Sequence, residues 1–150
     1  MAEKSKTANF TDVELAAMKE TAAERRTARS RSKKDPEQIR REGEEELLGK
    51  LAELSDDDRE LGEALHKLVT ETAPHLVPRT YYGMPAWGKD GKVLCFFQAA
   101  SKFKVRYATF GFDPTAALDD GNVWPTSFAV TKLGAKELDF LGELIRRAAS

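Results

Sequence analysis

The chain has 150 residues, of which 41% are hydrophobic and 33% are charged, and its formal net charge is −1. This length fits one domain with an appendage, and no run approaches the roughly 18 consecutive apolar residues that a membrane-spanning helix needs. The single cysteine, Cys95, excludes an internal disulfide framework and a metal site made of cysteines alone. The first residues lack the apolar segment of a secretory signal, so we expect a cytoplasmic protein with no membrane partner.

The first predicted helix begins at Thr11 and belongs to a basic N-terminal extension over residues 1–34. Thr11 and Glu14 have the spacing of a capping box, and Phe10 and Leu15 occupy the two positions of a hydrophobic staple. The apolar positions of this helix stop after two turns, so its second half has little to bury. We therefore expect the helix to project from the domain or to dock only loosely.

Charge is segregated along the first half of the chain. Residues 24–34 carry six cations and one acid, whereas residues 35–63 carry twelve acids and four cations. A basic segment without interleaved aromatic residues gives nucleic acid a salt-sensitive, non-specific contact at best. Nucleic acid and acidic proteins are therefore the less favoured partners of this segment, and a solvated arm or pairing with the acidic helices is the favoured interpretation.

Two amphipathic helices are predicted at the start of the main domain, which spans residues 35–150. Asp35 precedes a proline at the first helical position, and Ser55 precedes three aspartates that suit the positive end of a helix dipole. Gly43 is a candidate break within the first helix. The buried faces are predicted to hold Leu47, Leu48 and Leu51 in the first helix, and Leu61, Leu65, Leu68, Val69 and Thr72 in the second.

The chain then changes to the period of β-strands. The dipeptide Asp90-Gly91 carries the signal of a tight hairpin, and a central apolar strand follows it. Strands are predicted over residues 80–84, running on into 85–87, and over 93–99, 103–109 and 124–132, with a closing helix over 135–149. Pro125 suits an edge position or the entry of the last strand. The predicted fold class is α+β: an antiparallel sheet of about four strands packed against two preceding helices and a C-terminal helix, with an extra N-terminal helix.

Side chains with catalytic potential form no recognisable motif in the sequence. His66 and His75 lie outside any Ser/His/Asp or Cys/His pattern, and the glycines match no phosphate-binding loop. Cys95 lies between apolar residues in a predicted strand, where a buried and unreactive thiol is expected. We therefore expect a binding protein rather than an enzyme, with no required cofactor.

The second amphipathic helix carries a candidate metal site. Glu63 and His66 have the Glu-x-x-His spacing that di-iron bundles use, although one copy alone is present. Both side chains are predicted to point away from the leucine stripe, onto the same outer face as Asp56. Carboxylate oxygens with one imidazole suit iron or manganese. A solvated acidic face that keeps the protein in solution is the alternative interpretation.

The stretch from Tyr81 to Gly88 combines aromatic residues, two glycines and a proline. Together with Trp124, Lys104 and Arg106, this stretch can form a pocket that has aromatic walls and cationic ends and suits a small anionic ligand. Alternatively, it can bind a partner protein. The same aromatic residues would serve equally well in the core or at a strand edge. The candidate ligand-binding residues are Tyr82, Met84, Trp87, Lys104, Arg106 and Trp124.

At Tyr82-Gly83-Met84-Pro85, followed by residues 88–93 and the strand Phe96-Phe97-Gln98, the chain resembles the YdhG-like family, domain of unknown function 1801. The resemblance covers roughly residues 44–149. It implies a frataxin-like α/β sandwich without catalytic residues and, through a branch of intracellular iron chaperones, weak iron binding and delivery to iron-accepting proteins. The residues that would then hold iron are Glu45, Glu46, Asp56, Asp57, Glu60 and Glu63, with His66 beside them.

Overall fold

The computed structural model describes residues 11–31 and 35–150, and the side chains of residues 28–31 are not described. The predicted staple residue Phe10 and most of the basic segment therefore lie outside the described side chains. Within the described residues the elements are α2 (Asp12–Arg31), α3 (Pro36–Ala52), α4 (Asp56–Thr72), β1 (Val77–Tyr81), β2 (Met84–Lys89), β3 (Lys92–Gln98), β4 (Ala108–Phe112), β5 (Ser127–Val130) and α5 (Ala135–Ala148).

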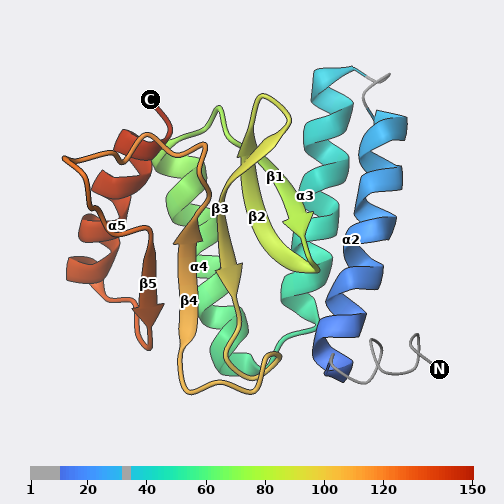
Figure 1. Cartoon of the computed structure of the whole chain (residues 1–150), viewed down its shortest axis with the longest axis horizontal. Coiled ribbons are helices and arrows are strands. Elements are labelled where there is room, and N and C mark those ends of the chain that lie inside the picture. The colour runs from blue at the N-terminus through green and yellow to red at the C-terminus, as the bar shows by residue number, and fades with distance from the viewer. Residues whose placement is uncertain (1–10, 32–34) are drawn as a thin grey trace.

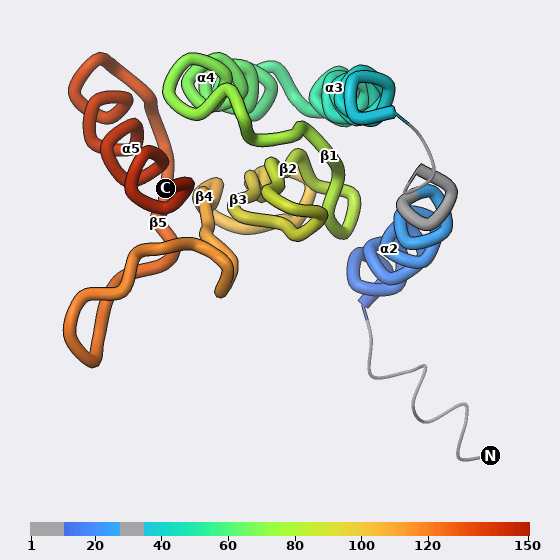
Figure 2. The backbone as a smooth tube through the Cα atoms, turned by 90° about the horizontal axis from the view of Figure 1, so that it is seen from above, coloured from blue at the N-terminus to red at the C-terminus, as the bar shows by residue number. Residues whose placement is uncertain are grey.

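The five strands form one antiparallel meander in the order β1-β2-β3-β4-β5 (Figure 1). Figure 2 shows α3, α4 and α5 along one face of this sheet and α2 beside its β1 edge. None of the described helices covers the opposite face, which lies between α2 and the segment of residues 113–126. The predicted α+β sandwich is confirmed, with five strands instead of about four.

The extra strand arises because residues 80–87 do not form one strand as predicted. β1 ends at Tyr81 and β2 begins at Met84, and the two strands pair antiparallel with Tyr81 opposite Met84. The two residues between them, Tyr82 and Gly83, have φ values of 52° and 77°. Two successive positive φ angles are what a type I′ hairpin turn requires. The second hairpin turn, at Asp90-Gly91, lies where it was predicted.

The predicted strand over residues 103–109 is also wrong, because β4 begins only at Ala108. Residues 100–104 form a turn, residues 106–107 form a bend, and Lys104 adopts a left-handed conformation with a φ of 55°. The backbone N–H groups of Ala100 and Ser101 donate to the buried carboxylate of Asp58 in α4 instead of to a neighbouring strand. β5 lies at the sheet edge, one of the two positions that Pro125 allowed for the strand over residues 124–132, and it is shorter than predicted.

The helices begin where the capping residues predicted. Thr11, Asp35 and Ser55 each accept a hydrogen bond from a backbone N–H in the first turn of their helix. Gly43 does not break α3, because it lies against β1, where an added Cβ would overlap the carbonyl oxygen of Pro78. Leu48, predicted to be buried, is 46% exposed.

The hydrophobic core lies between the sheet and the helices α3, α4 and α5. Among the described residues its cluster of buried side chains runs from Leu47 to Ala149 and includes none from α2. Its largest members are Trp87, Phe97 and Phe110. Cys95 is fully buried, as predicted, and burial raises the pKa of its thiol. Residues 35–150 therefore contain a complete core without the first helix.

Candidate functional site

Helix α2 is attached to the domain through a carboxylate bound by the Tyr82–Gly83 turn. Oε2 of Glu24 accepts the backbone N–H of Tyr82 at 3.1 Å, and Oε1 accepts the N–H of Gly83 at 2.9 Å. Successive left-handed residues point their N–H groups to the same side, and such a pair makes a concave anion site. Hydrogen bonds to an ionised acceptor are about twice as strong as neutral ones. The turn is thus a two-donor carboxylate site that Glu24 occupies.

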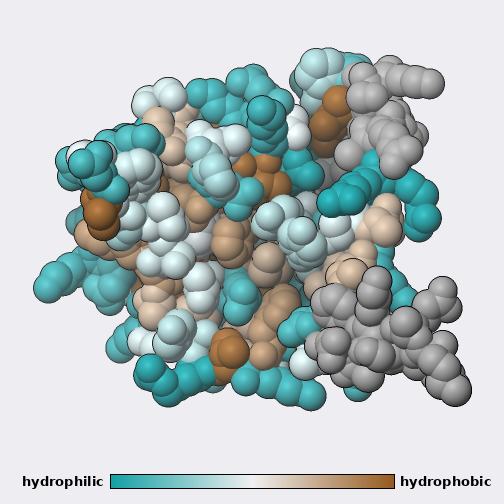
Figure 3. All heavy atoms as spheres, in the orientation of Figure 1, coloured by the Kyte–Doolittle hydropathy of each residue, from teal (hydrophilic) through white to brown (hydrophobic). Residues whose placement is uncertain are grey.

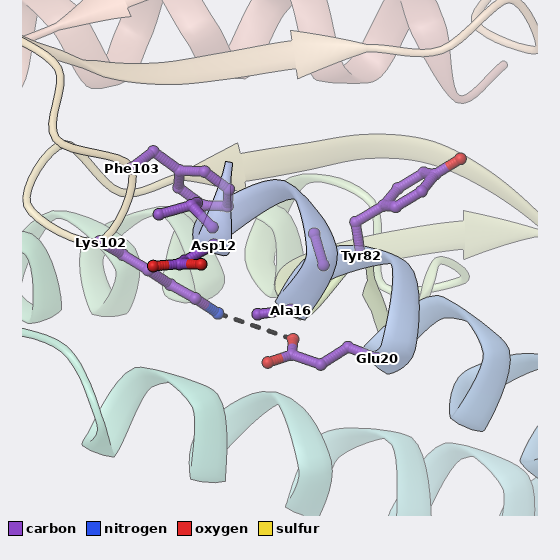
Figure 4. A pocket seen from close by; sticks show the side chains of 8 residues that line it. Asp12, Ala16, Glu20, Tyr82, Lys102 and Phe103 are labelled. Carbon is purple, nitrogen blue, oxygen red and sulfur yellow. Dashed lines mark ion pairs between the residues drawn. The ribbon is translucent and has the colours of Figure 1, made fainter. Parts of the chain in front are cut away.

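A second carboxylate, that of Glu20, enters the domain one helical turn earlier. Its Oε2 lies 3.8 Å from Nζ of Lys50 and 3.7 Å from Nζ of Lys102. Lys102 also donates to the carbonyl oxygen of Gly83 at 3.1 Å. Figure 4 shows Glu20 and Lys102 pointing toward one another at the edge of a pocket. Oε2 of Glu20 is buried, and within the described residues it has ion pairs but no hydrogen-bond partner.

Two cavities lie along α2. One, of about 260 Å³, is lined by Val13, Ala16 and Ala17 of the helix and by Tyr82 and Phe103 (Figure 4). The other, of about 620 Å³, has Glu24 and Thr27 of α2 on one side. Its opposite wall is formed by α3, β1 and the second hairpin turn, and the apolar side chains of that wall are Pro36, Ile39, Val77 and Pro78. The apolar side chains that the described part of α2 offers to the smaller cavity, those of Val13, Ala16 and Ala17, are short. The helix is therefore attached by two carboxylates and fills the space beneath it incompletely.

We call this surface the α2 groove: the face of the domain beneath α2, which carries the Tyr82–Gly83 turn, Lys50, Lys102, Phe103 and the wall of the larger cavity. Where Glu20 and Glu24 bind, its charged and donor groups complement acidic side chains, because it presents two lysines and two backbone N–H groups there. The wall of the larger cavity also includes the acids Glu46 and Asp90. Arg79 adds a cation at the larger cavity, where it donates to the carbonyl oxygen of Gly91 at 3.2 Å.

The six predicted ligand-binding residues do not meet in one place. Tyr82 lines the α2 groove, and Met84 and Trp87 are buried. Trp87 contacts α4 on the helix-covered side of the sheet. Lys104 and Arg106 are exposed, the latter stacked on Tyr107, and Trp124 packs against the core. The residues that do surround Tyr82, namely Glu20, Glu24, Lys102 and Phe103, were not predicted, nor was Lys50, which pairs with Glu20.

His66 occupies a different face of α4 from the one predicted. Its side chain is 13% exposed and lies between α3 and the sheet. Nδ1 accepts the indole N–H of Trp87 at 3.2 Å, and Nε2 lies 3.1 Å from Oε1 of Glu44. The prediction that His66 shares an outer face with Asp56 and Glu63 is therefore wrong. Both ring nitrogens already have protein partners.

The predicted iron-binding carboxylates are spread over the surfaces of α3 and α4. Arg59 contacts two of them, with Nη2 at 2.8 Å from Asp56 and Nε at 3.8 Å from Glu63. Within residues 11–31 and 35–150 no three His, Cys, Asp or Glu side chains form a group that could hold a metal ion. Glu46 is partly exposed, and the others, Glu45, Asp56, Asp57, Glu60 and Glu63, are exposed.

Asp58 differs from its exposed neighbours because its carboxylate is buried and both of its oxygens accept hydrogen bonds. It accepts the N–H groups of Ala100 at 3.3 Å and Ser101 at 2.9 Å, together with the hydroxyl of Ser55. Burial alone would raise the pKa of Asp58, but the donors of Ser101, Ser55 and Ala100 outweigh it and lower the pKa. This carboxylate holds the β3–β4 connection against α4, next to Lys102, which belongs to the α2 groove.

The sheet face without helices carries aromatic residues. In Figure 3 white and brown residues gather over the strands, and hydrophilic teal residues surround them. The rings of Tyr81 and Phe96 lie 5.8 Å apart, and Tyr82 contacts Tyr81 edge to face. Burial, and then the charge of Asp113, raise the pKa of Tyr81. Burial also raises the pKa of Asp113, against the opposing effect of Arg79.

Comparison with known proteins finds no family model, no curated protein and no solved structure that matches this chain. The resemblance to the YdhG-like family therefore stays a prediction. Among the described helices none is both long and apolar enough to cross a membrane. The arguments about function that follow rest on the geometry of the described residues.

Proposed function

We propose that the chain is a non-enzymatic binding protein that takes an acidic amphipathic helix of a partner into the α2 groove. The observation that carries this proposal is the carboxylate of Glu24, whose two oxygens each accept a backbone N–H of the Tyr82–Gly83 turn. A partner carboxylate would use the same two donors. Docking of an amphipathic helix in a groove is a common mode of peptide recognition.

The present occupant, α2, fits the groove poorly enough to be exchanged. The core contains no described residue of α2, so releasing the helix leaves the core intact. Cavities of about 260 and 620 Å³ lie beneath it. A covalently attached helix competes with a partner for the groove. The partner's apparent affinity is then its affinity for the open groove multiplied by the fraction of time that the groove is open. α2 thus acts as an internal competitor that sets the affinity for partners.

The groove specifies what the partner helix must carry. Glu20 and Glu24 are four residues apart and lie on one side of α2, so the partner needs two carboxylates at this spacing. One would bind the turn and the other would lie between Lys50 and Lys102. Where α2 has Val13, Ala16 and Ala17, a partner with larger apolar side chains would fill the smaller cavity. Each fully buried apolar side chain contributes about 1.5–3 kcal/mol.

The test uses residues 35–150, which contain the whole core, and a fluorescent synthetic peptide of residues 11–31 as the probe. Fluorescence anisotropy should show saturable binding, and circular dichroism checks that the shortened domain is folded. A matched peptide with Glu24→Gln should bind about tenfold more weakly, since a hydrogen bond to a charged group contributes about 1.5–3 kcal/mol. A peptide with Ala16→Leu and Ala17→Leu should bind more tightly. Equal binding of the first two peptides would contradict the proposal.

The full-length chain gives an independent readout. Glu24→Gln in the full chain should weaken the attachment of α2 and so increase its affinity for the wild-type peptide. Amide hydrogen exchange of α2 should become faster, whereas exchange in the core strand β3 should not change. An affinity of the variant for the peptide that is equal to or lower than that of the wild type would mean that α2 does not compete for the groove.

A further inference from the structure

The outer edge of β5 is an open strand edge. In the register of β4 and β5, Phe112 donates its N–H to the carbonyl of Thr126, and Phe110 lies opposite Phe128. Because hydrogen-bonded pairs alternate along an antiparallel ladder, residues 126, 128 and 130 direct their backbone groups at β4. Ser127 and Ala129 then direct their N–H and C=O groups away from the sheet, and both residues are exposed. No strand of the described chain pairs with this edge, which Figure 1 shows beside α5.

An apolar groove runs along this edge between β5 and α5. It encloses about 590 Å³, and its walls include Phe128 and Val130 of the strand and Phe140 and Leu141 of the helix. The ring of Phe140 is 57% exposed and lies 5.7 Å from that of Phe128, edge to face. Side chains of an added strand alternate between its two faces, so every second one would enter this groove.

The charges at the groove are mostly positive. Lys132 and Lys136 line it, and Glu137 is its one acid among the described lining residues. The carboxylate of Glu137 accepts the N–H of Gly134 at the start of α5, so it already has a structural role. An occupant with acidic side chains would therefore be attracted to both lysines.

We propose that the β5–α5 groove binds an extended acidic segment of a partner protein as a sixth strand of the sheet. Main-chain hydrogen bonds to Ser127 and Ala129 would provide affinity, and apolar side chains on Phe140 with acids on Lys132 and Lys136 would provide specificity. A second copy of this chain would bring like charges together. Residues 1–10 carry two lysines and one glutamate and do not supply the acids. This surface lies at the opposite edge of the sheet from the α2 groove and does not depend on it.

The test uses the full-length chain and a labelled synthetic probe: a capped nine-residue peptide in which valine and glutamate alternate. A peptide with lysine in place of each glutamate is the matched control. We expect the acidic peptide to bind in fluorescence anisotropy and to shift the backbone amide signals of residues 127–130 in NMR spectra. The lysine peptide should bind at least about tenfold more weakly, since two charge contacts are lost.

Variants of the chain separate strand addition from a general charge effect. Ala129→Pro removes an N–H that makes no bond to β4, and it should lower the affinity about tenfold or more. Ala129→Val keeps the N–H and should bind as the wild type does. Lys132→Glu with Lys136→Glu should abolish binding of the acidic peptide. Unchanged binding by Ala129→Pro, equal binding of the two peptides, or no binding by the wild type would each overturn the proposal. Sedimentation that shows a dimer dependent on the Ala129 N–H would overturn it in favour of self-pairing.

Discussion

Trp87 of β2 donates its indole N–H to Nδ1 of His66 in α4, at 3.2 Å. An indole nitrogen can only donate, so Nδ1 must be unprotonated and Nε2 must carry the ring hydrogen. Nε2 then donates to Oε1 of Glu44 in α3, at 3.1 Å. Trp87 is 1% exposed, and water does not replace a lost partner easily at such depth. Two hydrogen bonds thus connect the sheet, α4 and α3 through one imidazole.

Replacing His66 with leucine should destabilise the fold by about 1–3 kcal/mol, because the buried indole N–H loses its acceptor. Urea unfolding measures this free energy. The matched control is Trp87→Phe, which removes the donor instead. In the double variant the cost of His66→Leu should be smaller than in the single one, because no unpaired donor remains. Additive costs would show that the hydrogen bond contributes nothing to stability.

Two glycines of α3 should respond to alanine with opposite signs. Gly43→Ala places a Cβ against the carbonyl oxygen of Pro78 and must move α3 away from β1. Overpacking of this kind costs about 1–3 kcal/mol. An added Cβ at Gly49 meets no atom within 4 Å, so Gly49→Ala should stabilise the helix by about 0.5–1 kcal/mol. Thermal unfolding of the two variants is the measurement, and destabilisation by both would contradict the packing described.

Asp58→Asn should destabilise the protein in a pH-dependent way. The folded-state pKa of Asp58 is lowered, so its carboxylate stabilises the fold above the unfolded-state pKa, near 3.9 for an aspartate. This contribution is lost as the pH falls through the folded-state value. At pH 7 the substitution should cost about 1–3 kcal/mol, and the difference from wild type should shrink below about pH 4.

The neighbouring Asp57→Asn is the control for that experiment. Asp57 is exposed on the same helical turn, so its substitution should change stability by no more than about 0.5 kcal/mol at any pH. Urea unfolding at pH 3, 5 and 7 compares the three proteins. A constant difference between Asp58→Asn and wild type at all three pH values would show that the charge of Asp58 is not what stabilises the loop.

The resemblance to iron chaperones predicts weak binding of iron(II) to the acidic helices, and Arg59 should oppose this binding. The guanidinium of Arg59 contacts Asp56 and Glu63, two of the predicted ligands, and a metal ion would have to displace it. Arg59→Gln should therefore tighten binding by about two- to fivefold, as expected for the loss of a surface ion pair.

Anaerobic calorimetry of iron(II) binding should be run on the wild type, on Arg59→Gln and on a variant with Glu45, Glu46, Asp56, Glu60 and Glu63 neutralised. Binding that rises in Arg59→Gln and disappears in the neutralised variant would locate iron on these helices. No heat of binding in any of the three would remove iron as a ligand of this surface.

Much of the fold was predictable because the signals are local. Thr11, Asp35 and Ser55 begin helices through their own side chains, and Asp90-Gly91 turns a hairpin through its own backbone preference. The Tyr82–Gly83 turn was not predictable in this way, because tyrosine rarely adopts a positive φ. The turn closes the pairing of Tyr81 with Met84, and its N–H groups are bound by Glu24, a residue of another element. The loop before β4 was missed for a similar reason. The apolar alternation over residues 103–109 suggested a strand, but Asp58, a residue of another element, binds the start of this loop.

The candidate site was predicted only in part. Tyr82 lies in it, but its carboxylates and lysines come from three separate segments that only the fold brings together. The face of His66 was mispredicted because α4 packs against α3 as well as against α5 and the sheet, so its buried arc is wider than one leucine stripe. Acidic residues at a four-residue spacing in an otherwise basic helix, Glu20 and Glu24, were the available signal.

The buried position of Cys95 makes its thiol a probe for the opening of the sheet. It is the one thiol of the chain and lies at the middle of the sheet, shielded from solvent. A thiol reagent can reach it only when β3 separates from its neighbours, so the rate of labelling reports how often the sheet opens. Because no described side chain of α2 belongs to the core, release of this helix should leave that rate unaltered, whereas loss of the His66 hydrogen bonds should accelerate it.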